Sequence, residues 1–170
     1  MGIEIKEMIT DEEIKGKAYV YFSCWHDTYP GLVSQKYLDD LTPEKCEKIA
    51  FDTSENVIIA KDNNRVVGFI GYGVKTEDGI EVGEIMTLYV LSEYRGKGIG
   101  SRLMCAGLER LNRCSLLRIW VVKGNDKAIR FYEKFGFYPD GEEKTSEKVG
   151  ADGVRLTKRK STDKTDNKNI

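Results

Sequence analysis

The residues best suited to chemistry in this sequence form a short glycine-rich loop. The stretch YRGKGIG, residues 94–100, places three glycines and two cations within six positions, directly before a segment with helical spacing. Glycine lets the backbone adopt positive φ and approach a ligand closely, and a helix N-terminus offers unpaired N–H groups with partial positive charge. Arg95, Lys97 and Arg102 add positive charge nearby. The loop therefore predicts a phosphate-binding site, and the alternative is an ordinary glycine-rich turn.

The glycine spacing rules out two common phosphate-binding loops. A dinucleotide-binding loop has the pattern G-x-G-x-x-G, which Gly96, Gly98 and Ser101 do not follow. A P-loop requires GKS or GKT after four intervening residues, and the sequence contains no such run. The prediction is therefore a phosphate site of another kind, at a strand–loop–helix junction.

Three segments in this order resemble the GCN5-related N-acetyltransferase (GNAT) superfamily. RGKGIG matches the family signature Q/R-x-x-G-x-G/A, LYVLSEY resembles its central strand and turn, and VVKGNDKAIRFYEKFGF resembles its later strand–Asn–helix–Tyr segment. Together they cover roughly residues 84–138. The resemblance implies that the pyrophosphate of acetyl-CoA is held by the loop residues Arg95, Gly96, Lys97, Gly98, Ile99 and Gly100.

The resemblance also implies a role for the strand before the loop. In similar enzymes the backbone at Leu88, Tyr89 and Val90 pairs with the pantetheine arm, as an added strand would. The Val90 N–H would then polarise the thioester carbonyl. Because this strand usually carries a bulge in the family, simple alternation does not assign its side-chain faces.

Two catalytic residues follow from the same resemblance. Tyr132 matches the tyrosine that meets the CoA sulfur, and a phenol with a pKa of about 10 can protonate a departing thiolate. Its alternative role is core packing on a helical face with Ala128 and Phe135. Glu84 lies where many relatives place an acidic residue that deprotonates the amine through water. The alternative is a solvated carboxylate at the strand edge, and Glu81 is a rival candidate.

Further cofactor contacts are expected on the later helix. Asn125 is a candidate to bond the cofactor, to cap its helix, or to do both. Lys134 is a candidate for the 3′-phosphate, with a solvated lysine as the alternative.

The acceptor site is expected near the end of the first helix. Trp25 and Tyr29 lie in the stretch CWHDTYPGL, and aromatic residues beside an acidic residue, Asp27, suit a cation. Core packing of Trp25 is the alternative. His26 and Cys24 would permit a cysteine-hydrolase interpretation, which we disfavour because neighbouring side chains on a helix diverge.

The elements that position these residues follow from hydrophobic periodicity and capping signals. The order is strand, three helices, three strands, helix, strand, helix, strand. This predicts a single α/β (α+β) domain in residues 1–160, with a mixed, mostly antiparallel central sheet flanked by helices as in GNAT proteins, and a polar tail at 161–170. The expected strands lie near residues 2–8, 56–61, 65–74, 79–91, 115–122 and 153–158, and the expected helices near 11–25, 34–41, 43–51, 100–113 and 126–135.

The composition of the chain bears on its cellular location and on the classes of molecule that it binds. The chain has 170 residues, 40% of them apolar, and a net charge of −1, which gives no nucleic-acid signature. It has no long apolar run and no apolar signal core, so we expect a cytoplasmic protein without membrane partners. The four cysteines show no zinc spacing, and we expect reduced thiols and no metal. A homodimer is left open.

The sequence therefore predicts an enzyme that transfers acetyl from acetyl-CoA to a primary amine by direct attack in a ternary complex. Residues 1–157 carry −4 once the +3 of the last thirteen residues is set apart, which mildly favours a small cationic acceptor such as a polyamine. The alternatives are an aminoglycoside, a protein or peptide acceptor, and a non-catalytic acyl-CoA-binding sensor module.

Overall fold

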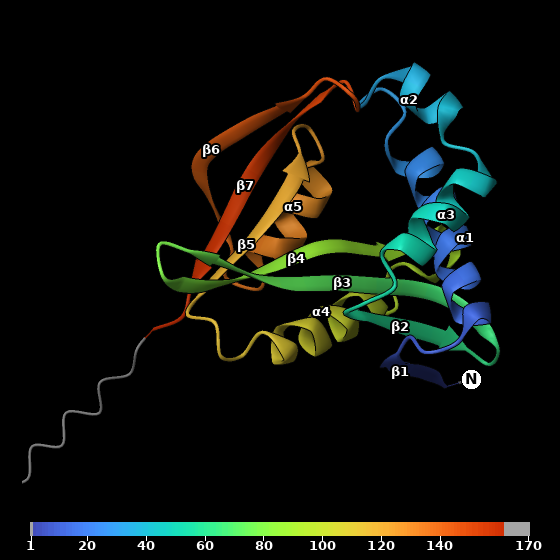
Figure 1. Cartoon of the computed structure of the whole chain (residues 1–170), viewed down its shortest axis with the longest axis horizontal. Coiled ribbons are helices and arrows are strands. Elements are labelled where there is room, and N and C mark those ends of the chain that lie inside the picture. The colour runs from blue at the N-terminus through green and yellow to red at the C-terminus, as the bar shows by residue number, and fades with distance from the viewer. Residues whose placement is uncertain (1, 162–170) are drawn as a thin grey trace, which may run out of the picture.

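A seven-stranded mixed sheet, in the order β1-β2-β3-β4-β5-β7-β6, organises the chain in a computed structural model that describes residues 2–161 (Figure 1). All neighbouring strands are antiparallel except β4 and β5. This confirms the predicted fold class; the predicted tail lies, apart from Ser161, outside the described residues. The elements are β1 Ile3–Glu7, α1 Asp11–Thr28, α2 Gln35–Asp40, α3 Pro43–Asp52, β2 Val57–Asp62, β3 Arg65–Glu77, β4 Ile80–Val90, α4 Ile99–Arg110, β5 Leu116–Val122, α5 Asp126–Glu133, β6 Tyr138–Ser146 and β7 Ala151–Arg159.

One predicted count is wrong, because the C-terminal region forms two strands rather than one. β6 is an edge strand that pairs only with β7, and its side chains are mostly exposed. Its sequence, YPDGEEKTS, lacks the alternation of apolar and polar residues that identifies a half-buried strand. β6 forms because β7 offers backbone partners, and local sequence gives no sign of this.

Helix α1 begins at a capping box. The Thr10 hydroxyl accepts from the Glu13 N–H at 3.2 Å, and the Glu13 carboxylate accepts from the N–H groups of Thr10 (3.2 Å) and Ile9 (2.8 Å). Burial raises the pKa of the Glu13 carboxyl, but ion pairs with Lys6 and Lys61 and the two amides outweigh burial and lower it to about 2. Glu13 thus joins the start of α1 to strands β1 and β2.

This carboxylate predicts a decline of stability in acid. A carboxyl whose pKa is lower in the folded state stabilises the fold above its ordinary pKa of 4.5, and this contribution is lost as pH falls towards 2. We expect Glu13→Gln to lower the free energy of unfolding by about 1.5–3 kcal/mol at pH 7 and to flatten its decline between pH 5 and 2. Urea denaturation across this pH range measures both, with the exposed neighbour Glu12→Gln as control. Equal pH dependence in Glu13→Gln and the native chain would contradict the assignment.

The two central strands separate halfway along their length. β4 pairs with β5 only from Val82 to Ile85, and the rest of β4 leaves β5. At the same point the pairing of β4 with β3 shifts register: Thr87 is opposite Gly71, and Ile85 is opposite Tyr72, so Met86 is an extra residue. This is the bulge that the family resemblance implies. Because β4 and β5 are no longer paired beyond this point, a gap lies between them that connects the two faces of the sheet.

Two clusters of buried side chains form the core. The larger packs α4, α5 and part of α1 against the sheet, and the smaller lies among α1, α2 and α3 and includes Trp25. Within residues 2–161, no helix has the length and hydropathy needed to cross a bilayer.

Candidate functional site

The glycine loop presents backbone N–H groups at the start of α4. Gly96 and Gly98 have φ of 74° and 80°, and Gly98 is the N-cap of α4 without a side-chain cap. The Arg102 N–H bonds the Gly98 carbonyl at 3.1 Å, so the preceding amides of the first turn point out of the helix end. A Cβ at Gly96 or Gly98 would meet no other heavy atom within 4 Å. The loop thus borders open space where an anion fits.

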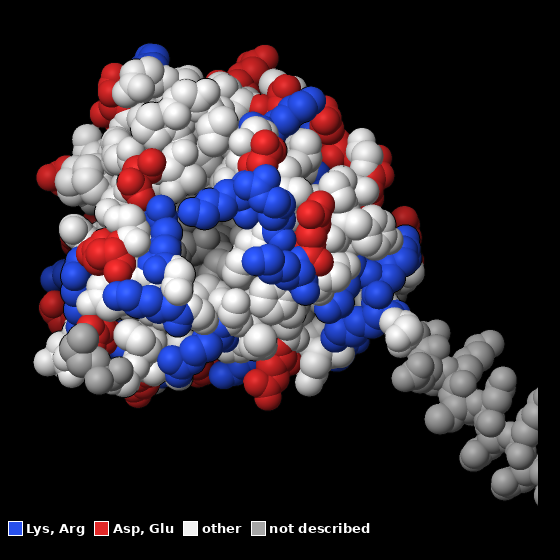
Figure 2. All heavy atoms as spheres, turned by 180° about the vertical axis from the view of Figure 1, so that it is seen from behind, with Lys and Arg blue, Asp and Glu red and all other residues white. Residues whose placement is uncertain are grey.

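A groove of about 640 Å³ runs from this loop along β4 and α5. Figure 2 shows Lys and Arg side chains gathered around a hollow on the face opposite to that of Figure 1. Lys97 is not among the lining residues, because its ammonium lies over the Tyr94 ring, 5.2 Å from the centroid. The positive lining and the amides suit the phosphates of a nucleotide cofactor. The basic lining residues are Arg95, Lys127, Arg130 and Lys134.

The edge of β4 that faces the groove keeps backbone groups for a ligand. The Leu91 N–H bonds the Val67 carbonyl of β3 at 2.9 Å, so the Val90 backbone points to the other edge. There the Val90 carbonyl accepts from Arg95 Nε at 2.9 Å and from the Cys24 thiol at 3.4 Å. Leu88, two residues earlier on the same edge, lines the groove. This edge is suited to pairing with an extended pantetheine arm.

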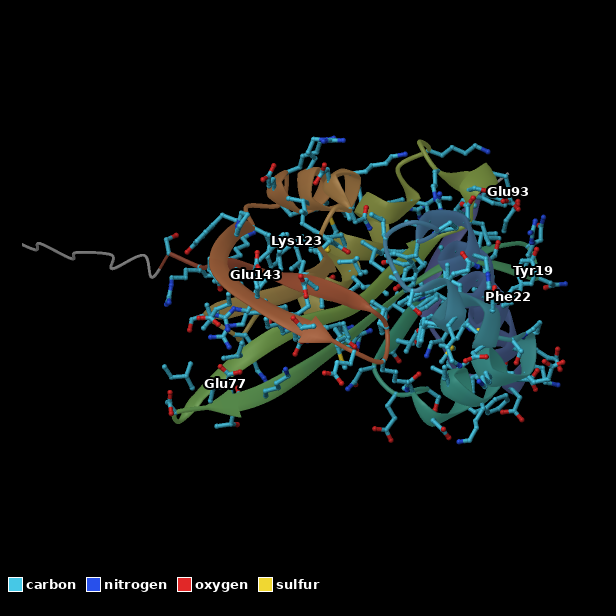
Figure 3. The ribbon with its side chains drawn as sticks, turned by 90° about the horizontal axis from the view of Figure 1, so that it is seen from above. Tyr19, Phe22, Glu77, Glu93, Lys123 and Glu143 are labelled. Carbon is cyan, nitrogen blue, oxygen red and sulfur yellow. The ribbon has the colours of Figure 1, made fainter. Side chains whose placement is uncertain are left out.

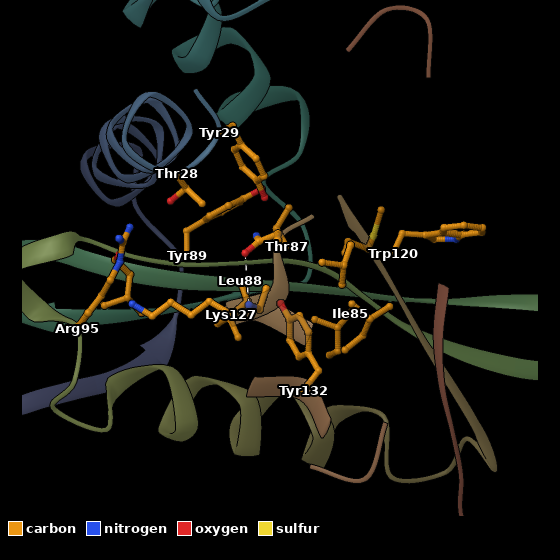
Figure 4. Close-up of a pocket in the computed structure, with 16 residues that line it drawn as sticks. Thr28, Tyr29, Ile85, Thr87, Leu88, Tyr89, Arg95, Trp120, Lys127 and Tyr132 are labelled. Atoms are coloured by element: carbon orange, nitrogen blue, oxygen red, sulfur yellow. Dashed lines mark hydrogen bonds between the residues drawn. The ribbon is translucent and has the colours of Figure 1, made fainter. Parts of the chain in front are cut away.

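Tyr132 stands where the groove meets a second cavity, of about 200 Å³, in the gap between β4 and β5 (Figure 4). Its ring is 8% exposed and packs against Phe131 and Phe137, while its hydroxyl points into the cavity. Burial, and to a smaller extent the nearby Tyr29, raises the pKa of the Tyr132 hydroxyl. The Tyr132 hydroxyl is therefore protonated at physiological pH and its ring packs in the core, and its use as a proton donor stays a prediction.

Asn125 and Tyr29 close one side of the second cavity. The Asn125 side chain accepts from the Ala128 N–H at 3.3 Å, which caps α5, and it also lines the cavity. Burial raises the pKa of the Tyr29 hydroxyl, and contacts from Tyr89 and Asn125 partly oppose that rise. We call the face of the sheet towards α1, where Tyr29, Tyr89 and Thr87 lie, the acceptor side (Figure 4).

Glu84 lies on the acceptor side of β4 but outside the lining of the cavity. Its carboxylate, 13% exposed, pairs with the ammonium of Lys75. Its rival Glu81 is half exposed and pairs with Arg113 at 3.4 Å. Glu84 directly precedes Ile85, which lines the cavity, whereas Glu81 is four residues away from it along β4, and the use of Glu84 as a base stays a prediction.

Three other candidate residues of α1, namely Trp25, Asp27 and Cys24, do not line the second cavity. Trp25 is 8% exposed, packs against Tyr29 and does not line the cavity. Asp27 is held by Arg95 at 3.0 Å. Cys24 is buried, and burial raises the pKa of its thiol to about 11, which does not suit a nucleophile.

The sequence interpretation missed several lining residues. Lys127 and Arg130 of α5 line the groove, and Trp120 and Met86 line the second cavity. The alternation in β5 could have placed Trp120 opposite the buried Ile119. No local signal identifies Met86, because the bulge depends on pairing between strands.

Comparisons with known proteins agree with this geometry. Residues 19–137 match the family model described as "Acetyltransferase (GNAT) family". The uncharacterized N-acetyltransferase YuaI of Bacillus subtilis is 30% identical over 129 residues, 73% of this chain and 74% of that protein. The spermidine N(1)-acetyltransferase of Thermoplasma acidophilum is 29% identical over 147 residues, 81% of this chain and 89% of that protein. The crystal structure of PH1933 from Pyrococcus horikoshii has a TM-score of 0.74 at 26% identity, and the match covers 94% of this chain and 99% of that one.

Proposed function

Since the chain belongs to the acetyltransferase (GNAT) family and is an acetyl-CoA-dependent N-acetyltransferase, we propose that it acetylates the primary amine of a small cationic acceptor such as a polyamine. One observation supports transfer in particular: the basic groove and the second cavity meet at Tyr132, in the gap between β4 and β5. A thioester bound from the groove side and an amine bound from the acceptor side would meet there.

Two observations support the cationic acceptor. The relative from Thermoplasma acidophilum is a spermidine N(1)-acetyltransferase and aligns over 81% of this chain. Residues 1–157 carry a net charge of −4, the whole-chain −1 less the +3 of the last thirteen residues. A net negative field raises the local concentration of a cation.

The residues of this chain have distinct tasks in the proposed transfer. Acetyl-CoA supplies the activated acetyl group. The loop amides, with Arg130 and Lys134, are expected to hold its phosphates, and the Val90 N–H to stabilise negative charge on the carbonyl oxygen. Tyr132 gives its hydroxyl proton to the thiolate that leaves as the amine attacks directly. Glu84 takes a proton from the amine through water, once Lys75 leaves its carboxylate.

An amine panel tests the proposal. We expect thiol release from acetyl-CoA to depend on spermidine, with much lower rates for an aminoglycoside and for peptides with a free N-terminus. Thiol release without amine measures hydrolysis and is the control. Turnover confined to peptides would replace the small-amine acceptor with a protein or peptide. Binding of acetyl-CoA with no turnover on any amine would identify a sensor module instead.

A further inference from the structure

Trp120 is a large aromatic residue on the acceptor side. It has no role in the transfer reaction proposed above. Its neighbour Ile119 is paired in register with Ile85, which lies beside Gly107 of α4, so Ile119 faces α4 and Trp120 points to the opposite face. It lines the second cavity together with Tyr29 and Thr87. Figure 4 shows its ring extending away from Tyr132 and Arg95, so it is placed to meet the end of an acceptor that is distant from the reacting amine.

The ammonium group of Lys144 already lies over the ring of Trp120. The Lys144 ammonium lies 4.1 Å from the ring centroid. Lys144 is exposed, and within residues 2–161 no carboxylate forms an ion pair with it. Neighbouring cations have acid partners: Lys75 pairs with Glu84, Lys123 with Glu143 at 3.1 Å (Figure 3), and Arg155 with Asp140 at 2.6 Å. The Arg155 guanidinium also lies near the Trp120 ring, but farther from the centroid, at 5.9 Å.

We propose, on the basis of the function proposed above, that Trp120 binds the second ammonium of a diamine or polyamine acceptor and that Lys144 competes for the same ring. Tryptophan offers the strongest aromatic face for an ammonium ion. Two ammonium groups on one ring repel each other, so Lys144 must leave when the acceptor binds. Since Lys144 has no carboxylate partner within residues 2–161, its displacement costs only the cation–π contact that the acceptor ammonium then replaces.

The position of Trp120 suits this role. Glu84 is paired in register with Arg118, and Trp120 is the next residue on the same face of β5. Glu84 and Trp120 are thus diagonal neighbours on adjacent strands, with Cα atoms roughly 8 Å apart. An acceptor with a short alkyl chain between two nitrogens can place its reacting amine near Glu84 and its second ammonium on Trp120.

The experiment compares KM for spermidine and for the monoamine butylamine in five proteins. These are the native chain, Trp120→Phe, Trp120→Leu, Lys144→Met and Lys148→Met. We expect Trp120→Leu to raise KM for spermidine by roughly 2- to 30-fold, the range of a cation–π contact, and Trp120→Phe to raise it less. KM for butylamine stays unchanged, because a monoamine has no second ammonium.

Lys144→Met supplies an independent readout that does not alter the cavity wall. It should lower KM for spermidine, while Lys148→Met, the same change in the turn between β6 and β7, should not. If the native chain acetylates spermidine and Trp120→Leu folds but leaves KM unchanged, the inference is wrong and the proposed function stands. A higher KM in Lys144→Met would also overturn it, since Lys144 would then bind the acceptor. If the native chain acetylates no amine, the proposed function and this inference fail together.

Discussion

Replacement of Tyr132 with phenylalanine is expected to lower kcat by about 10²- to 10⁴-fold, the contribution of one general acid. The change removes one hydroxyl and keeps the ring, which packs against Phe131 and Phe137. The hydroxyl points into the cavity where the groove ends, and burial keeps it protonated. Affinity for acetyl-CoA should change little, because the phosphates are expected to bind at the loop. Steady-state kinetics with saturating acetyl-CoA measures kcat, and calorimetry measures affinity.

The matched control is Tyr138→Phe, which removes the same hydroxyl from an exposed tyrosine of β6. Its kcat should equal that of the native chain. An unchanged kcat in Tyr132→Phe, in an assay limited by chemistry, would mean that water or another residue supplies the proton. A loss confined to affinity would make Tyr132 a cofactor contact.

The second large effect is expected at the glycine loop, where Gly100→Leu should abolish binding of acetyl-CoA. Gly100 lies in the first turn of α4 and lines the groove, and a Cβ there would be 3.7 Å from the Phe131 ring and 4.0 Å from Val90 Cγ2. A leucine side chain would extend into the space between α5 and β4. Because a ligand that binds only the folded state raises Tm, the native chain should show a rise with acetyl-CoA that the variant lacks.

Gly100 is a better test than Gly98, because Gly98 has φ of 80° and any side chain there strains the backbone. Gly100→Ala is the control: its Cβ makes only ordinary contacts, so the rise in Tm should persist. Without ligand, the leucine variant should melt close to the native chain. A normal rise in Tm in folded Gly100→Leu would remove the loop from the cofactor site.

Local sequence predicted the features that depend on local interactions. The left-handed glycines at 96 and 98 and the Asn125 cap of α5 are both present. Each is fixed within one turn of the chain. The glycines of the loop therefore correctly predicted a backbone with positive φ.

Features that depend on pairing between distant segments were missed or incompletely predicted. Strand β6 requires β7 as a partner, and the extra residue Met86 arises from the register between β3 and β4. The ion pair of Glu84 with Lys75 and the contact of Trp120 with Lys144 join different strands. No periodicity in a single segment carries such information, so the residues of the acceptor side were predicted less completely than the conformation of the glycine loop.

The separation of β4 from β5 has a consequence for how the protein behaves among other chains. A strand edge with unpaired amides and carbonyls ordinarily invites another chain to add to the sheet, which is a route to aggregation. Here that edge lies inside the sheet, beside α5, and the Val90 carbonyl is already occupied by Arg95 and Cys24. A strand of another chain ordinarily adds at an outer edge of a sheet, and β4 is not an outer strand. The unpaired backbone groups of β4 are thus kept away from the outer strands β1 and β6, where such addition ordinarily takes place.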